Sequence, residues 1–169
     1  MFLAGTYELT IDAKNRLSIP FAVRRDLTEE TDGHAFWLMP GRRPGTLTLI
    51  PKKHFEQLRA QRPDDESLSE EAFAYRQWED SQSVLLDPDG QGRVLIPERL
   101  LKAVGIEKDV ALVGRGDRLE LWNRGRYESF AGEMWADYPT RRARAMDEEK
   151  KLLAARRAGG DGSTGSSGP

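Results

Sequence analysis

A short motif occurs twice in this chain, and this repeat limits the possible folds more than any other feature. The segment 12–20 reads DAKNRLSIP, and the segment 89–97 reads DGQGRVLIP. Aspartate, arginine, isoleucine and proline recur at identical spacing in the two copies. A unit this small cannot bury a core unless it packs against another unit. We therefore expect two copies of one supersecondary unit packed together, with any functional residue of the motif present in duplicate.

The start of each copy predicts a β-hairpin with a tight turn. Residues 6–12 alternate between apolar and polar side chains, as a half-buried strand does, and a second strand-like run begins at Arg16. Asn15 of the first copy is replaced by Gly92 in the second. Both residue types tolerate a positive φ. We therefore predict left-handed backbone at both positions.

After the hairpin, both copies continue with the same series of elements. Each has a short helix that opens at a proline, then two strands and a trailing helix. The helix 97–104 is expected to end at Gly105, because glycine is favoured after a helix C-terminus. Between the copies, Ser67 and Glu70 have the spacing of a capping box, which predicts a helix over 68–81. The remaining helices are predicted at 20–27, 52–61 and 127–135, and the strands at 35–39, 46–50, 110–113 and 118–122.

These patterns divide the chain into five segments. The first repeat covers 1–62, a linker with a helix covers 63–83, and the second repeat covers 84–138. A charged helical extension is expected at 139–158, after Pro139. Residues 159–169 form a Gly/Ser-rich tail that we expect to be disordered.

The composition narrows the class of protein. The chain has no cysteine, and 32% of its residues are charged. No apolar run reaches the roughly 18 residues of a membrane span, and no signal peptide is expected, so we predict a cytoplasmic protein. P-loop, dinucleotide and nucleophile-elbow motifs are absent, and His34 and His54 have no metal-ligand spacing. We expect no catalysis, no cofactor, no metal, no membrane contact and no small-molecule substrate.

The turns of the two hairpins are the strongest candidates for a binding site, because exposed turns on a rigid scaffold often carry recognition residues. Arginine contacts guanine edges bidentately, Asn and Gln contact adenine, and lysine suits phosphate. A two-stranded ribbon also fits the major groove of DNA. The predicted DNA-contacting residues are Lys14, Asn15 and Arg16 in the first copy, and Gln91 and Arg93 in the second.

Two further readings of the charged residues remain open. Asp12 and Asp89 either take part in binding or pair with the arginines of the motif and hold the turns in shape, and for aspartate we favour the structural role. Three basic pairs would extend a phosphate-binding face, namely Arg24-Arg25, Arg42-Arg43 and Lys52-Lys53.

The motifs resemble those of the MraZ family of bacterial transcriptional regulators, which has an AbrB-like swapped-hairpin fold. The opening MFLAGTY and the first DAKNR with SIP resemble the first MraZ signature, and DGQGRVLIP with LELW at 119–122 resembles the second. The similarity covers about residues 1–138. The chain departs from the family pattern at Asn15, where glycine is usual, and at Gln91, where lysine is usual.

The resemblance implies an α+β fold of two AbrB-like swapped-hairpin repeats, closed as one intramolecular pseudo-dimeric β-barrel with flanking short helices. It also implies a ring-like homo-oligomer, associated with the nucleoid, that binds tandem repeats in double-stranded promoter DNA near division and cell-wall genes. Carried over by position, the family's DNA-contacting motif falls on Lys14, Asn15 and Arg16, and on Gln91 and Arg93. The alternatives are an antitoxin-like AbrB regulator with a protein partner and an oligomeric interaction barrel that binds no DNA.

Overall fold

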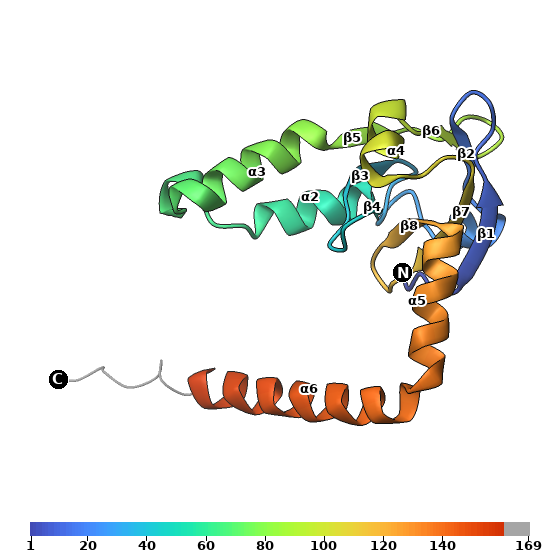
Figure 1. The fold of residues 1–169 in the computed structure, drawn as a ribbon. Helices are drawn as coiled ribbons and strands as arrows, with labels where there is room; N and C mark the ends of the chain where they lie inside the picture. Colours follow the sequence, from blue (N-terminus) through green and yellow to red (C-terminus); the bar gives the residue numbers. More distant parts are fainter. Residues whose placement is uncertain (161–169) are drawn as a thin grey trace. The chain divides into compact units, whose positions relative to one another are not determined.

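The computed structural model describes residues 1–160 and divides the chain into two compact units (Figure 1). The first unit covers Met1–Tyr127 and contains both copies of the repeat. The second begins at Glu128 and contains helix α6 (Tyr138–Gly160). Helix α5 (Arg124–Ala136) begins in the first unit and continues into the second. From residue 161 onward, the predicted tail lies outside the described residues.

The two copies have the same order of elements, as the sequence predicts. Each contains two strands around a turn, a helix, and then two further strands followed by a helix. The first copy consists of β1 (Thr6–Thr10), β2 (Arg16–Ser18), α1 (Phe21–Arg25), β3 (Phe36–Pro40), β4 (Thr46–Pro51) and α2 (Lys52–Ala60). The second consists of β5 (Val84–Leu86), β6 (Arg93–Leu95), α4 (Glu98–Val104), β7 (Asp109–Gly114), β8 (Leu119–Asn123) and the start of α5.

The sheets interlock the two copies. The larger sheet has the order β1-β7-β8-β4-β3-β5, and all of its pairs are antiparallel. If each strand of this sheet is replaced by its equivalent in the other copy (β1 by β5, β3 by β7, β4 by β8, and the reverse), the same order is obtained, read from the other edge. The first strand of each copy pairs with the third strand of the other, β1 with β7 and β5 with β3. The fold is therefore α+β, with a pseudo-twofold relation between the copies.

The predicted hairpin is correct in its turn but wrong in its pairing. A tight turn does join β1 to β2, yet these two strands pair with strands of the other copy, β1 with β7 and β2 with β6. Alternation of apolar and polar residues predicts that a strand forms, but it does not specify the partner. The partner is selected by burial, since Leu17 and Val94 are opposite each other in the antiparallel pair of β2 and β6, and both are fully buried.

One apolar core fills the space between the sheets and helices of the first unit. Both copies contribute equivalent residues, such as the isoleucines of the two motifs, Ile19 and Ile96. The short helices contribute Val23 from α1 and Leu100 from α4. The core also includes residues with no exposed surface on the longer strands, namely Phe36, Leu38, Leu47, Leu49, Val110, Leu112, Leu119 and Leu121. Because the core is shared, we expect that neither copy folds without the other.

The linker forms a helix that lies with α2 beside the sheet, and we call α2 and this linker helix together the helical arm. After α2, a single 3-10 turn (Asp65–Ser67) leads into α3 (Glu70–Gln82). The predicted capping box is wrong by two residues, because Ser69 caps the helix and its Oγ accepts from the Ala72 amide at 3.3 Å. Ser67 instead donates its amide to the Asp64 side chain.

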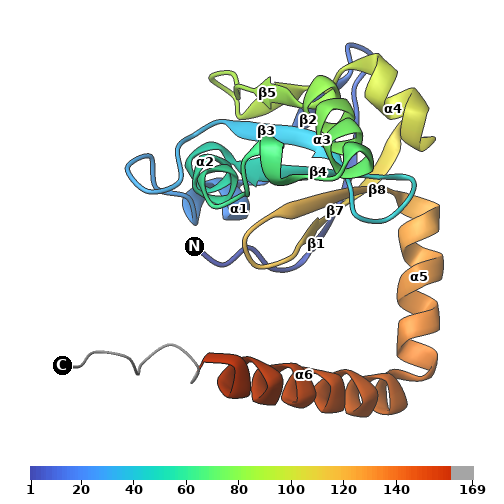
Figure 2. The same ribbon diagram turned by 90° about the vertical axis from the view of Figure 1, so that its left-hand side faces the viewer.

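Helices α2 and α3 lie side by side and both pack against β3 (Figure 2). Two ion pairs connect α2 and the residues after it to α3: Arg59 pairs with Asp80 at 2.6 Å, and Arg62 pairs with Glu79 at 2.9 Å. The arm is separate from the two turns in the sequence, and it forms one wall of a pocket beside the sheet.

Candidate nucleic-acid interface

Turn one, residues 12–16, is closed by two backbone hydrogen bonds. The Asp12 amide donates to the Arg16 carbonyl at 3.0 Å, and the Asn15 amide donates to the Asp12 carbonyl at 2.9 Å. Asn15 has a φ of 58°, and no other non-glycine residue of the described chain has a positive φ. The predicted left-handed backbone at this position is confirmed.

Turn two, residues 89–93, repeats this geometry. The Asp89 amide donates to the Arg93 carbonyl at 2.9 Å, and the Gly92 amide donates to the Asp89 carbonyl at 2.8 Å. Gly92 has a φ of 74°, so the second left-handed position is confirmed as well. The exchange of asparagine for glycine between the copies therefore follows a backbone requirement.

The first aspartate of the motif holds turn one together. Asp12 Oδ1 accepts hydrogen bonds from the amides of Lys14 at 2.8 Å and Arg16 at 3.0 Å, and its Oδ2 accepts from Arg16 Nε at 2.7 Å. These bonds lower the pKa of the Asp12 carboxyl, with the Arg16 amide as the largest cause. The carboxylate is therefore used inside the turn.

The second aspartate does the same in turn two. Asp89 accepts from the amides of Gln91 at 2.9 Å and Arg93 at 3.0 Å, and from Arg93 Nε at 2.9 Å. The Arg93 side chain is the main cause that lowers the pKa of Asp89 to about 2. The structural role predicted for the two aspartates is confirmed by these bonds.

The aspartates also orient the two arginines of the motif. Arg16 and Arg93 are each about one-third exposed. Within residues 1–160, the two Nη atoms of Arg16 have no hydrogen-bond partner, because Asp12 occupies only its Nε. The terminal fork of Arg16 is thus fixed in direction and still able to donate two parallel hydrogen bonds. Lys14 and Gln91 are exposed beside these arginines, and Asn15 is half-buried.

Each turn is bonded to the other copy, and the two turns lie at opposite ends of the antiparallel pair that β2 forms with β6. The Ile19 amide donates to the Gly92 carbonyl, and the Ile96 amide donates to the Asn15 carbonyl, both at 2.9 Å. These bonds extend the pairing of β2 with β6 up to the turns. The five predicted site residues, which come from two distant segments of the chain, therefore lie at the two ends of one short pair of strands.

Arg24 of helix α1 lies against turn two, in line with the predicted extension of the basic face by the pair Arg24-Arg25. Its Nε donates to the Ile19 carbonyl at 3.1 Å, and its guanidinium covers Gly92 of turn two. The pair Arg24-Arg25 is recognisable in the sequence as basic, but its position depends on where α1 packs. Turn two lacks the lysine of turn one, so Arg24 supplies a positive charge where the motif has lost one.

The other basic pairs lie elsewhere. Arg42 and Arg43 are in the loop between β3 and β4, and Arg43 lies over the Trp122 ring at 5.9 Å. Lys52 and Lys53 begin α2, and Lys53 Nζ donates to the carbonyls of residues 29 and 30. The predicted extension of one basic face over all three pairs is therefore supported for Arg24 alone.

Both histidines lie near carboxylates. His54 Nε2 lies 3.1 Å from Asp117, whose pKa is lowered chiefly by Arg118 and also by His54. His34 Nε2 lies 3.1 Å from Asp87, and its Nδ1 lies 3.9 Å from Glu29. Among the described residues, no group of three or more potential ligands is arranged to hold a metal ion. In the same part of the chain, no helix has both the length and the apolar character needed to cross a membrane.

Comparison with known proteins identifies similar sequences. A family model described as "MraZ protein, putative antitoxin-like" matches residues 81–149. A transcriptional regulator MraZ of Mycoplasmopsis pulmonis is 32% identical over 130 residues, which cover 77% of this chain and 84% of that protein. Proteins of the same name in Acidovorax sp. and Heliobacterium modesticaldum are 32% and 31% identical and cover 80% and 90% of this chain, and 92% and 96% of their own lengths.

Proposed function

This chain belongs to the MraZ family, and from that premise we propose that it is a sequence-specific DNA-binding transcriptional regulator. The relatives are named as transcriptional regulators, and none of the three names describes an enzyme. The observation that carries the proposal is the pair of matching turns, each with an arginine held by an aspartate of its own turn.

The contacts assigned to the turns follow from the chemistry of their side chains. Arg16 presents its terminal fork to the O6 and N7 edge of a guanine, as a major-groove contact requires. Lys14 contacts a phosphate as a flexible point charge. The other proposed contacts are Asn15, Gln91 and Arg93. Turn two carries less positive charge than turn one, unless Arg24 reaches the same DNA.

The interlocked strands support a more specific proposal about the fold. We assign the two copies as AbrB-like swapped-hairpin repeats, since each copy donates its first strand to the third strand of the other. The domain limits that follow are 1–62 and 84–138 for the repeats. The closed pseudo-dimeric barrel belongs to this proposal.

The oligomeric assembly and the DNA target are proposed from the family resemblance. One pair of turns provides few contacts, and a ring-like homo-oligomer raises the effective concentration of each further pair at tandem promoter repeats. The promoters would lie near division and cell-wall genes, which makes the protein cytoplasmic and nucleoid-associated.

The test is the affinity for operator DNA of the Arg16→Ala variant. Operator sequences are first selected from random double-stranded DNA with the unaltered protein. Arg16→Ala should weaken specific binding by about tenfold or more, because one bidentate arginine contact contributes about 1–3 kcal/mol.

Lys108→Ala is the matched control, since Lys108 is an exposed cation outside the motif. It should leave specific binding within about twofold of the unaltered protein. Unchanged affinity of a folded Arg16→Ala protein, or failure of the selection to enrich any sequence, would contradict the proposal.

A second candidate function is an antitoxin-like regulator, which the description of the matching family model favours. Such a protein would bind DNA and also a toxin. Purification of the full chain from its native cells, followed by mass spectrometry, tests this directly. A stoichiometric protein partner that inhibits growth when expressed alone would support the antitoxin function, and its absence at stoichiometric level would reject it.

A further inference from the structure

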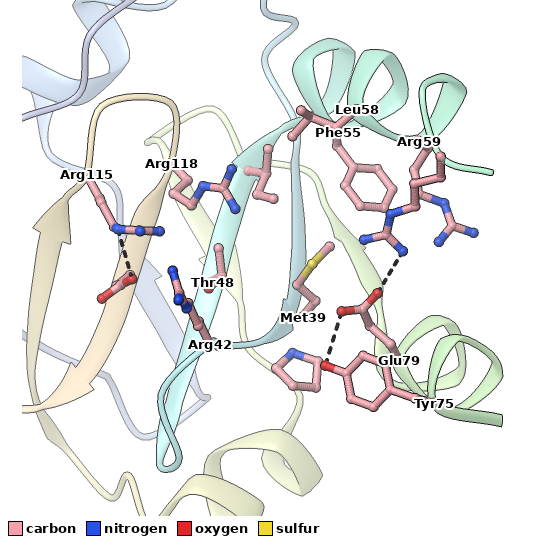
Figure 3. A pocket seen from close by; sticks show the side chains of 15 residues that line it. Met39, Arg42, Thr48, Phe55, Leu58, Arg59, Tyr75, Glu79, Arg115 and Arg118 are labelled. Atoms are coloured by element: carbon pink, nitrogen blue, oxygen red, sulfur yellow. Dashed lines mark hydrogen bonds and ion pairs between the residues drawn. The ribbon is translucent and has the colours of Figure 1, made fainter. Parts of the chain in front are cut away.

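A pocket of about 460 Å³ lies between the helical arm and the sheet of the first unit (Figure 3). Its walls come from β3, β4, α2 and α3, and from the loop between β7 and β8. The volume falls in the range of about 300–1,000 Å³ that is typical of small-molecule sites. None of its lining residues belongs to turn one or turn two.

Five arginines and two glutamates line this pocket. Arg42 comes from the β3–β4 loop, Arg115 and Arg118 come from the β7–β8 loop, and Arg59 and Arg62 come from the end of α2 and the residues after it. The two glutamates are Glu79 and Glu120. Gathering so many cations in one concave site raises the local potential and attracts anions.

The ion pairs inside the protein leave part of this positive charge uncompensated. Glu79 pairs with Arg62, and Glu120 pairs with Arg115 at 3.8 Å through its Oε1, while its Oε2 accepts from Trp122 Nε1. Asp80 and Asp117, outside the lining, pair with Arg59 and Arg118.

Even with all four carboxylates counted, the arginines are in excess. Arg42 is exposed and has neither a hydrogen bond nor an ion pair within residues 1–160. Because its guanidinium meets no internal carboxylate, Arg42 is free to donate to an oxyanion from outside.

The opposite side of the pocket carries aromatic and apolar side chains among paired charges. Figure 3 shows Arg42, Arg115 and Arg118 on one side, and Phe55, Leu58 and Tyr75 on the other, beside Arg59 and Glu79. Arg59 pairs with Asp80, and Glu79 pairs with Arg62, so Phe55 and Leu58 are left to pack against the apolar body of a ligand whose charged end meets the first side.

We propose that this pocket binds a small organic anion, with a phosphate or carboxylate group held by Arg42, Arg115 and Arg118 and an apolar or aromatic body packed against Phe55. Phosphate and carboxylate share the arrangement of oxygens that an arginine fork recognises. A phosphate of DNA is a less suitable occupant, because a sugar-phosphate backbone has no apolar body to pack against Phe55. The pocket does not depend on the function proposed for the turns.

Calorimetric titration of the full chain with phenyl phosphate and with phenylacetate tests the proposal. Both probes carry an aromatic ring, so the comparison separates a phosphate ligand from a carboxylate ligand. Saturable binding of either probe below about 10 mM, with no binding of uncharged benzyl alcohol, is the expected result.

Two neighbouring variants assign the binding to the pocket. Arg42→Gln should weaken the probe's affinity about tenfold, as expected when a charged hydrogen bond is removed. Arg43→Gln changes the adjacent residue of the same loop, which does not line the pocket, and should leave the affinity unchanged. Equal weakening by both variants, or no saturable binding of either probe, would overturn the proposal.

DNA binding of Arg42→Gln distinguishes the other occupant. If Arg42 neutralised a DNA phosphate, its replacement by glutamine would reduce the salt slope of DNA binding by about 0.9. That outcome would also overturn the proposal, whereas an unchanged salt slope together with weakened probe binding supports it.

Discussion

The guanidinium of Arg24 lies against Gly92, so close that a Cβ atom at position 92 would stand 2.6 Å from Arg24 Nε. The two residues come from different copies of the repeat, and the motif itself does not predict that they meet. Turn two is therefore built from both halves of the protein, and its glycine serves both a positive φ and a close approach.

The first prediction concerns this glycine. Gly92→Ala should destabilise the protein by about 1–2 kcal/mol, because alanine is strained at a φ of 74°. The flexible end of Arg24 can move away, so the steric contact adds little. Urea unfolding measures the change, and Asn15→Gly, at the equivalent left-handed position, should cost less than about 1 kcal/mol. Equal destabilisation by the two variants would contradict the argument.

A second prediction follows for Arg24 itself. If Arg24 replaces the charge that Gln91 lacks, Arg24→Gln should reduce the salt slope of DNA binding by about 0.9 or more. The slope is the change of log affinity with log salt concentration. Arg25→Gln provides the control, since Arg25 pairs with its neighbour Asp26 rather than covering a turn. The same slope for both variants would remove Arg24 from the interface.

The third prediction separates shape from charge at position 16. Arg16→Lys keeps the positive charge but lacks the fork that Asp12 orients. Discrimination against one altered base pair of the operator should fall by about 1–3 kcal/mol, while binding to random DNA is retained. Lys14→Ala should instead weaken binding to operator and random DNA alike. Competition titrations with single-base operator variants measure both effects.

The fourth prediction concerns acid. The pKa of Asp89 is about 2 in the folded protein and close to 3.9 in an unfolded chain, so protonation favours unfolding. Its contribution to stability should be complete above about pH 4 and disappear as the pH falls towards 2. Asp89→Asn should therefore flatten the fall in unfolding free energy between about pH 4 and 2. Glu107→Gln, an exposed control, should not have this effect.

The fifth prediction tests the pairing of β2 with β6. Leu17 is fully buried opposite Val94, and Leu17→Ala should cost about 2–5 kcal/mol of unfolding free energy. Because the β2–β6 pair joins both copies, the Leu17→Ala variant should still unfold in one transition, with the same midpoint by far-UV circular dichroism and tryptophan fluorescence. Two separate transitions would mean that the copies fold independently.

The features that the sequence predicts correctly are local ones. The left-handed residues, Asn15 and Gly92, and the αL residue Gly105 after α4 are all predictable, because each depends on the backbone preferences of one residue. The predicted cap of α3 is misplaced, since Ser67 and Ser69 are both acceptable caps by residue type. The choice between them depends on the 3-10 turn that the linker forms before the helix.

The amino-acid pattern alone predicts the duplication, the order of the elements and the residues of the two turns, because these follow from a repeat and from local backbone preferences. The tertiary structure decided which strands pair, that Arg24 covers turn two, and that five arginines meet in one pocket. These arrangements join residues far apart in the chain. Their partners are selected by burial of a shared core, which no local pattern specifies.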